Sequence, residues 1–94
     1  MKFNMGTALL KIKIMPNSPT TDLKKIEKKA QEIVLKSEGR HFSVEIEPIA
    51  FGLNAMIVSF AIDESKSIED IENKFRGIND VSSVDVIDFR RAFG

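Results

Sequence analysis

The order in which two hydrophobic periodicities follow one another constrains the fold of this chain most strongly. Apolar residues occupy every second position of residues 8–14, an alternation typical of a half-buried β-strand. A stripe with the three- and four-residue spacing of a helix follows, and it consists of Leu23, Ile26, Ala30, Ile33 and Val34. Thr20, Thr21 or Asp22 can cap the start of this helix. Gly39 is expected to end it.

The second half of the chain carries the same two kinds of signal. Residues 42–46 alternate as a second strand, and residues 53–62 are apolar enough for a central third strand. Ser67 resembles the first residue of a capping box and opens a short amphipathic helix that ends at Gly77. Residues 84–89 form the last expected strand. The order strand, helix, strand, strand, helix, strand is the ferredoxin-like βαββαβ pattern of an α+β fold.

This pattern predicts a four-stranded antiparallel sheet with two helices on one face. Right-handed crossovers make the first and second strands parallel, with the third strand antiparallel between them. Residues 48–52 then lie at one end of the sheet, and residues 89–91 emerge at the opposite end, about 25 Å away for strands of eight residues. These two segments cannot line one small-molecule pocket. They can form the two ends of one elongated protein contact.

The composition sets limits on domain number, location and general partners. The 94 residues allow a single domain, residues 1–94. Fourteen basic residues balance fourteen acidic ones, so the net charge gives no general attraction to nucleic acid or anionic lipid. The absence of cysteine fits a reducing cytoplasm. Lys11 and Lys13 interrupt the apolar N-terminal stretch, and no apolar run approaches the ~20 residues of a membrane helix.

Catalytic chemistry has little support in this sequence. His41 is the only histidine, there is no cysteine, and no serine stands near a plausible base. Neighbouring carboxylates occur at residues 63–64 and 69–70, on an expected loop and a helix start, where acidic residues suit the helix dipole. The five glycines are scattered, so no phosphate-binding loop is present. We therefore expect a protein that is not an enzyme and has no catalytic residue, metal or cofactor of its own.

Two other functions suit a ferredoxin-like module and stay open as alternatives. One is a regulatory domain that dimerises or binds a small metabolite. The other is RNA binding, in which aromatic residues of the first and third strands stack on bases. The first strand has no aromatic residue, and the expected stacking positions of the third hold residues such as Asn54 and Met56. RNA binding is therefore disfavoured.

The connection at residues 47–53 carries apolar side chains where a surface turn is expected. Pro48 lacks a backbone donor and Gly52 can take a positive φ, so the segment is a connection between strands. Ile49 and Phe51 nevertheless lie on it. Connections usually run over the surface, so these side chains either fold back as a lid on the core or meet a partner.

The C-terminal residues combine positive charge and aromatic rings. Arg90 and Arg91 stand between Phe89 and Phe93. This segment is either a frayed, solubilising tail or an ordered end in which Phe89 packs on the sheet edge and fixes the direction of the arginines.

Three segments together resemble the archaeal elongation factor 1-beta family: residues 13–16, residues 47–53 and residues 83–91. The resemblance extends over essentially the whole chain. It implies a ferredoxin-like guanine nucleotide exchange domain that replaces GDP by GTP on elongation factor 1-alpha, the GTPase that delivers aminoacyl-tRNA. The chain is also similar to the C-terminal exchange domain of the eukaryotic beta subunit.

The resemblance also implies roles for both ends of the molecule. In the eukaryotic relatives a lysine just before the C-terminal residue is pushed toward the magnesium and phosphate site of the GTPase. The matching residue here is Arg91, which keeps the charge but has a planar guanidinium group in place of a compact ammonium group. Arg90 can share its role. The connection at residues 48–52 resembles the family segment near the second domain of the GTPase. The expected partner-binding residues are Pro48, Ile49, Phe51, Gly52, Phe89, Arg90, Arg91 and Phe93.

Overall fold

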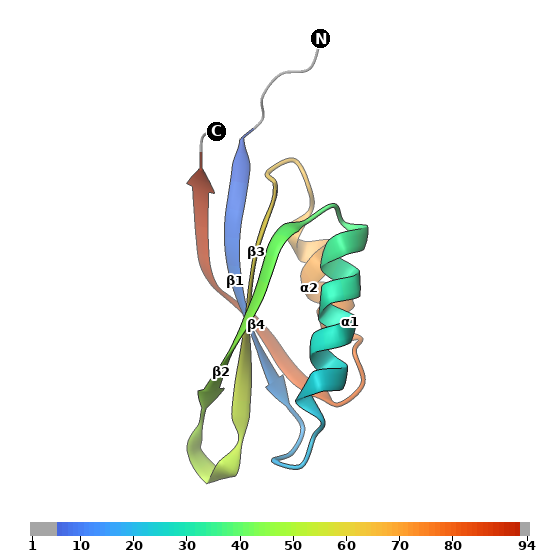
Figure 1. Ribbon diagram of the computed structural model, residues 1–94, viewed down its shortest axis with the longest axis vertical. Helices are drawn as coiled ribbons and strands as arrows, with labels where there is room; N and C mark the ends of the chain where they lie inside the picture. Colours follow the sequence, from blue (N-terminus) through green and yellow to red (C-terminus); the bar gives the residue numbers. More distant parts are fainter. Residues whose placement is uncertain (1–5, 93–94) are drawn as a thin grey trace.

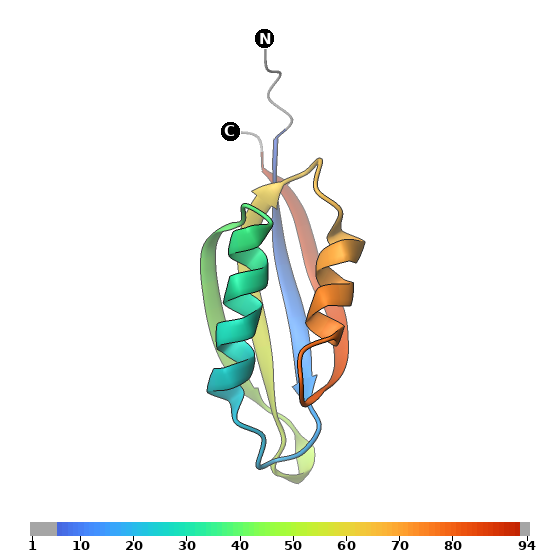
Figure 2. The same ribbon diagram turned by 90° about the vertical axis from the view of Figure 1, so that its right-hand side faces the viewer.

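A twisted four-stranded sheet carries both helices on one of its faces (Figures 1 and 2). The computed structural model describes residues 6–92. Its elements are β1 (Thr7–Pro16), α1 (Leu23–Lys36), β2 (Arg40–Pro48), the short 3₁₀ turn η1 (Ala50–Gly52), β3 (Asn54–Asp63), α2 (Ile68–Arg76) and β4 (Val81–Ala92). The strand order is β2-β3-β1-β4, and every neighbouring pair is antiparallel. The expected α+β, ferredoxin-like arrangement is confirmed.

The core lies between the sheet and the helices, as the alternation in β1 predicts. Its four alternating apolar residues are at most 1% exposed, and they are Ala8, Leu10, Ile12 and Ile14. Because directly opposed residues of antiparallel strands share a face, β3 adds its own apolar row through pairs such as Ile12 with Val58. The helices close the core with Ile26, Ala30 and Val34 of α1 and with Ile71 and Phe75 of α2. Burial of the apolar row of β1 determines which face of the sheet packs against the helices.

Both helices start where the sequence indicates. Asp22 is the N-cap of α1, and its Oδ1 accepts a hydrogen bond of 3.0 Å from the backbone N–H of Lys24. Ser67 caps α2, with its Oγ accepting from the N–H of Asp70 at 3.2 Å. Each cap satisfies a backbone donor that has no partner within the helix.

The prediction that Gly39 ends the first helix was wrong in its detail. The helix ends at Lys36, and Glu38, not the glycine, takes the left-handed conformation, with φ 65°. The N–H of Gly39 donates to the Val34 carbonyl at 2.8 Å and that of Glu38 to the Leu35 carbonyl at 3.0 Å, the two hydrogen bonds of a Schellman motif. Glycine is needed at position 39 for space, because a Cβ there would collide with Val34 Cγ1 and lie 3.0 Å from the Val34 carbonyl oxygen.

Strand β4 is longer than expected and contains the two arginines. It continues beyond Phe89 to Ala92 and pairs Arg90 with Leu9 and Arg91 with Ala8. A frayed tail is therefore the wrong description of residues 90–92. Phe93 lies outside the described residues.

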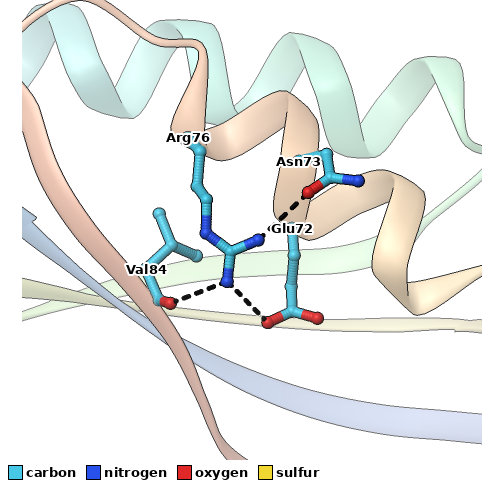
Figure 3. A network of polar contacts seen from close by, with 4 residues as sticks. All are labelled: Glu72, Asn73, Arg76 and Val84. Atoms are coloured by element: carbon cyan, nitrogen blue, oxygen red, sulfur yellow. Dashed lines mark hydrogen bonds and ion pairs between the residues drawn. The ribbon is translucent and has the colours of Figure 1, made fainter.

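A network of polar contacts around Arg76 joins α2 to β4 (Figure 3). Arg76 donates from Nη1 to Asn73 Oδ1 at 3.0 Å and from Nη2 to Glu72 Oε2 and the Val84 carbonyl oxygen, both at 3.4 Å. The contact to Val84 crosses from the last turn of the helix to the neighbouring strand. It helps hold β4 in place along its first half.

The register fixes the distance between the two ends of the sheet. Residues 49–53 follow β2 and precede β3 beside the end of β1, whereas Arg91 pairs near the start of β1. Along the ten residues of β1 this separation is about 30 Å. Figure 1 shows the hairpin and the C-terminal end of β4 at opposite ends of the elongated molecule. In the described part of the chain, no helix is long and apolar enough to span a membrane.

The crowding around Gly39 gives a test of the fold. Substitution Gly39→Ala should lower the free energy of unfolding by about 1–3 kcal/mol, because Val34 or the backbone must move. Gly77→Ala is the matched control, since a Cβ there meets its nearest atom, the Lys74 carbonyl oxygen, at 3.5 Å and φ is −81°. Its stability should stay within about 1 kcal/mol of the original. Equal losses in urea unfolding would contradict the proposed role of Gly39.

Candidate functional site

The β2–β3 hairpin is tightly hydrogen-bonded. The N–H of Ile49 donates to the Leu53 carbonyl at 2.7 Å, and the N–H of Leu53 donates to the Ala50 carbonyl at 3.4 Å. Between them Phe51 has φ 64° and Gly52 has φ 77°. Pro48 ends β2 opposite Asn54. The backbone thus fixes the direction of the residues at the tip.

Phe51 is the most exposed large apolar side chain in the described part of the protein. It is 94% exposed, whereas Ile49 is half-buried. The alternative in which Phe51 folds back as a lid on the core is wrong. The left-handed backbone costs a residue with a side chain about 1–2 kcal/mol. A strained backbone that holds an aromatic ring in solvent is the kind of outlier that marks binding sites.

The hairpin has a neighbour that sequence reasoning missed. A Cβ built on Gly52 would lie 3.8 Å from Pro19 Cβ, so the β1–α1 loop lies beside the hairpin tip. The loop is held from its other side by the N–H of Asn17, which donates to the Asp80 carbonyl at 2.8 Å. Pro19 is exposed and extends the apolar surface around Phe51. We call Pro19, Ile49 and Phe51 the apolar end.

At the opposite end, the two arginines lie on different faces of the sheet. Arg91 pairs with Ala8 and therefore shares the face that the helices cover, and Phe89 does so through its pairing with Leu10. Arg90 pairs with Leu9 and lies on the uncovered face. Phe89 is 43% exposed.

A β-bulge in β4 determines on which face of the sheet each arginine lies. Lys11 pairs with Asp88 but Ile12 pairs with Val86, so Ile87 is an extra residue on β4. Without this extra residue, the alternation of Val84 and Val86 would continue through Asp88 to Arg90 and would put Arg91 on the uncovered face. One inserted residue moves the side chain of each later residue of β4 to the opposite face of the sheet.

Each arginine has a carboxylate beside it. Arg90 Nε lies 3.1 Å from Asp88 Oδ2, and Arg91 Nε lies 3.5 Å from Glu64 Oε2. Both guanidinium groups remain mostly exposed. Glu64, on the β3–α2 loop, is a second residue that sequence reasoning missed. We call Arg90, Arg91 and Glu64 the charged end.

The remaining surfaces bear on the alternative functions. Phe60, the aromatic residue of β3, is 3% exposed and faces the helices, where its ring packs edge-on against Phe75 at 6.5 Å. On the uncovered face, β1 and β3 of the described chain therefore offer no aromatic residue for base stacking. His41 is exposed on the edge strand β2, at a bulge. Within residues 6–92, no group of three or more histidine or carboxylate side chains is placed to hold a metal ion.

Two surface depressions are lined by residues other than Pro19, Ile49 and Phe51. One, of about 760 Å³, runs between the helices, with lysines such as Lys25 and Lys29 and acids such as Glu32 along its sides. The other, of about 280 Å³, lies on the uncovered face near Leu9 and Arg90. The charges of both signs around the first depression are typical of a solvated helix surface.

Comparisons with known proteins agree with the resemblance seen in the sequence. The model of the EF-1 guanine nucleotide exchange domain matches residues 9–92. Elongation factor 1-beta of Methanosarcina barkeri is 39% identical over 88 residues, covering 93% of this chain and 99% of the relative. The protein of the same name from Methanothermobacter thermautotrophicus is 38% identical, with 93% and 98% covered. That from Methanocaldococcus jannaschii is 36% identical over 85 residues, with 89% and 96% covered. The fold and the match over nearly the full chain show that this protein belongs to the EF-1 guanine nucleotide exchange domain family.

Proposed function

We propose that this nucleotide exchange factor of translation elongation acts on the GTPase elongation factor 1-alpha by binding it with both ends of its sheet. The observation that carries the proposal is the placement of Phe51 and Arg91. They lie in two of the three segments of the family resemblance, at opposite ends of β1, and both are exposed. Membership of the family indicates that the protein promotes guanine nucleotide exchange. The placement of Phe51 and Arg91 supports the proposal that it contacts the GTPase with both ends of its sheet.

The apolar end is the anchor in this proposal. Phe51, Ile49 and Pro19 offer a compact apolar surface on a backbone that is already fixed. An aromatic side chain that fills a pocket of the partner can contribute much of the affinity of an interface. Because the tip is ordered in advance, little conformational entropy is lost on binding. Pro48 and Gly52 shape the hairpin, and its partner would be the second domain of the GTPase.

The charged end is the active part in this proposal. Magnesium and oriented backbone donors hold nucleotide phosphates in GTPases. A guanidinium brought to that site competes with the metal and loosens the segments that help hold the nucleotide. Arg91 is the residue for this role, and Phe89 and the β4 pairing hold it in place. Arg90 lies on the other face and would contact a different part of the partner, and Phe93 would extend the contact.

The exchange itself needs no covalent chemistry. The factor accelerates release because it binds nucleotide-free GTPase better than nucleotide-bound GTPase, since equal affinity for both states would shift nothing. In this proposal residues 1–94 act as a single exchange domain in the cytoplasm, where the translation machinery is. The domain needs no cofactor, membrane or direct contact with nucleic acid.

The charged end can be tested by a single substitution. Arg91→Gln should reduce the acceleration of GDP release about 10- to 100-fold, because a charge-assisted contact worth roughly 1.5–3 kcal/mol is lost. Stopped-flow release of a fluorescent GDP from the cognate GTPase measures this. Arg91→Lys should retain most of the acceleration. A point substitution is preferable to truncation, because residues 90–92 pair with β1.

The control for this test removes an arginine elsewhere. Arg40 is exposed on the edge strand β2 and pairs with Ala61. Arg40→Gln should exchange nucleotide at the original rate. An Arg91→Gln variant with the original acceleration would contradict the role of the charged end.

The apolar end predicts a separation of stability from affinity. Phe51→Ala should leave the free energy of unfolding within about 0.5 kcal/mol, because the ring is in solvent. The concentration of factor that gives half-maximal exchange should rise about tenfold or more, as for loss of an interface anchor. Phe60→Ala is the contrasting variant and should lose about 3–5 kcal/mol of stability, since its ring is buried. Unchanged affinity of Phe51→Ala would refute the anchor.

A further inference from the structure

Glu64 combines features that are unusual for a surface carboxylate. It follows β3 in the loop that leads to α2, and its side chain is only 21% exposed. Its Oε2 atom is buried and accepts no hydrogen bond. The guanidinium Nε of Arg91 lies 3.5 Å from this same atom, too far for a good hydrogen bond but close enough for an ion pair. The positive charge of Arg91 is therefore what compensates this buried oxygen.

The two members of the pair depend on it unequally. Arg91 is 64% exposed, so water can solvate its guanidinium without Glu64. The Oε2 atom of Glu64 has no such alternative, because it is out of contact with water and a carboxylate oxygen left unpaired there is disfavoured. Movement of Arg91 away from Glu64 is therefore opposed mainly by the carboxylate. This one-sided dependence distinguishes the pair from an ordinary exposed ion pair, which restrains its members little.

The contact also orients the guanidinium. Nε is the nitrogen nearest the aliphatic chain, and the terminal amino groups lie beyond it. Backbone pairing with Ala8 fixes the base of the Arg91 side chain, and Glu64 contacts it again at Nε. With two points fixed, the outer edge of the planar group is left to meet an oxyanion, for which its fork geometry suits a bidentate contact.

We propose that Glu64 is a positioning residue for nucleotide exchange, which holds the Arg91 guanidinium with its outer edge toward the partner's phosphate and metal site. This inference rests on the proposed function, because it assigns to Arg91 the role described above. The geometry links three elements that are distant in the sequence: the β3–α2 loop, the start of β1 and the end of β4. Their juxtaposition makes the carboxylate part of the charged end.

The experiment measures GDP release from the cognate GTPase with four proteins: the original chain, Glu64→Gln, Arg91→Gln and the double variant. Glu64→Gln should reduce the acceleration about two- to tenfold, the range expected when two contacting residues are coupled. In the Arg91→Gln background it should have no further effect, because Glu64 acts through that arginine. Glu64→Gln should lower the maximal rate of GDP release more than it changes the concentration of factor that gives the half-maximal rate.

Glu38→Gln is the matched control, since it also removes one carboxylate from an ion pair in a neighbouring loop. Glu38 Oε1 lies 2.8 Å from Lys66 Nζ, and this hydrogen bond and charge raise the pKa of Lys66 above its usual value. Glu38 is exposed, and its ion pair joins Lys66 rather than an arginine of the charged end. Its substitution should leave exchange unchanged.

A second readout does not depend on exchange. In ¹⁵N NMR spectra of the protein alone, the Arg91 Nε–H signal should shift and exchange faster with water in Glu64→Gln, and the Arg90 signal should not. Unchanged Arg91 spectra would overturn the inference. So would normal exchange by Glu64→Gln when Arg91→Gln is slow, or exchange by the double variant that is slower than by Arg91→Gln alone. Normal exchange by Arg91→Gln would instead overturn the proposed function, and this inference with it.

Discussion

The antiparallel pairing of β1 on both of its sides is the constraint on which the rest of the structure depends. Its apolar row is buried under the helices, so a shift of either neighbour by one residue would turn apolar side chains to solvent. The same pairing brings the start of β3 to one end of β1 and the end of β4 to the other. The separation of Phe51 from Arg91 is therefore a consequence of core burial. The two segments that we propose as contacts with the GTPase need no direct contact with each other.

Local departures from ideal geometry determine which side chains this frame exposes at its two ends. The extra residue Ile87 puts Arg91 on the helix side, within reach of Glu64. The left-handed conformation of Phe51 holds its ring in solvent, where it contributes nothing to the core of the free protein. Both features cost stability or regularity, and both are located at the ends that we propose as contacts with the GTPase. In the proposed complex, stability and binding thus depend on different parts of the molecule.

Much of the fold could be predicted from the sequence because burial follows simple periodicities. The alternation in β1 and the helical stripe from Leu23 to Val34 gave the order of elements, and that order placed the hairpin and Arg91 at opposite ends. The prediction for Gly39 was wrong because a glycine after a helix can serve close packing while its neighbour takes the left-handed turn. The bulge could have been recognised, since the apolar phase changes between Val86 and Phe89. Glu64 and Pro19 could not be assigned, because their contacts depend on how loops from distant parts of the chain meet.

The central claim is that one molecule contacts the GTPase with both ends of its sheet in the same complex. The most direct test is cross-saturation NMR of the isotopically labelled factor bound to nucleotide-free GTPase. Signal loss should be strongest at residues 49–52 and 89–91 together, and the outer side of α1, around Lys28, should be unaffected. Signal loss confined to one end, or centred on the helices, would contradict the account.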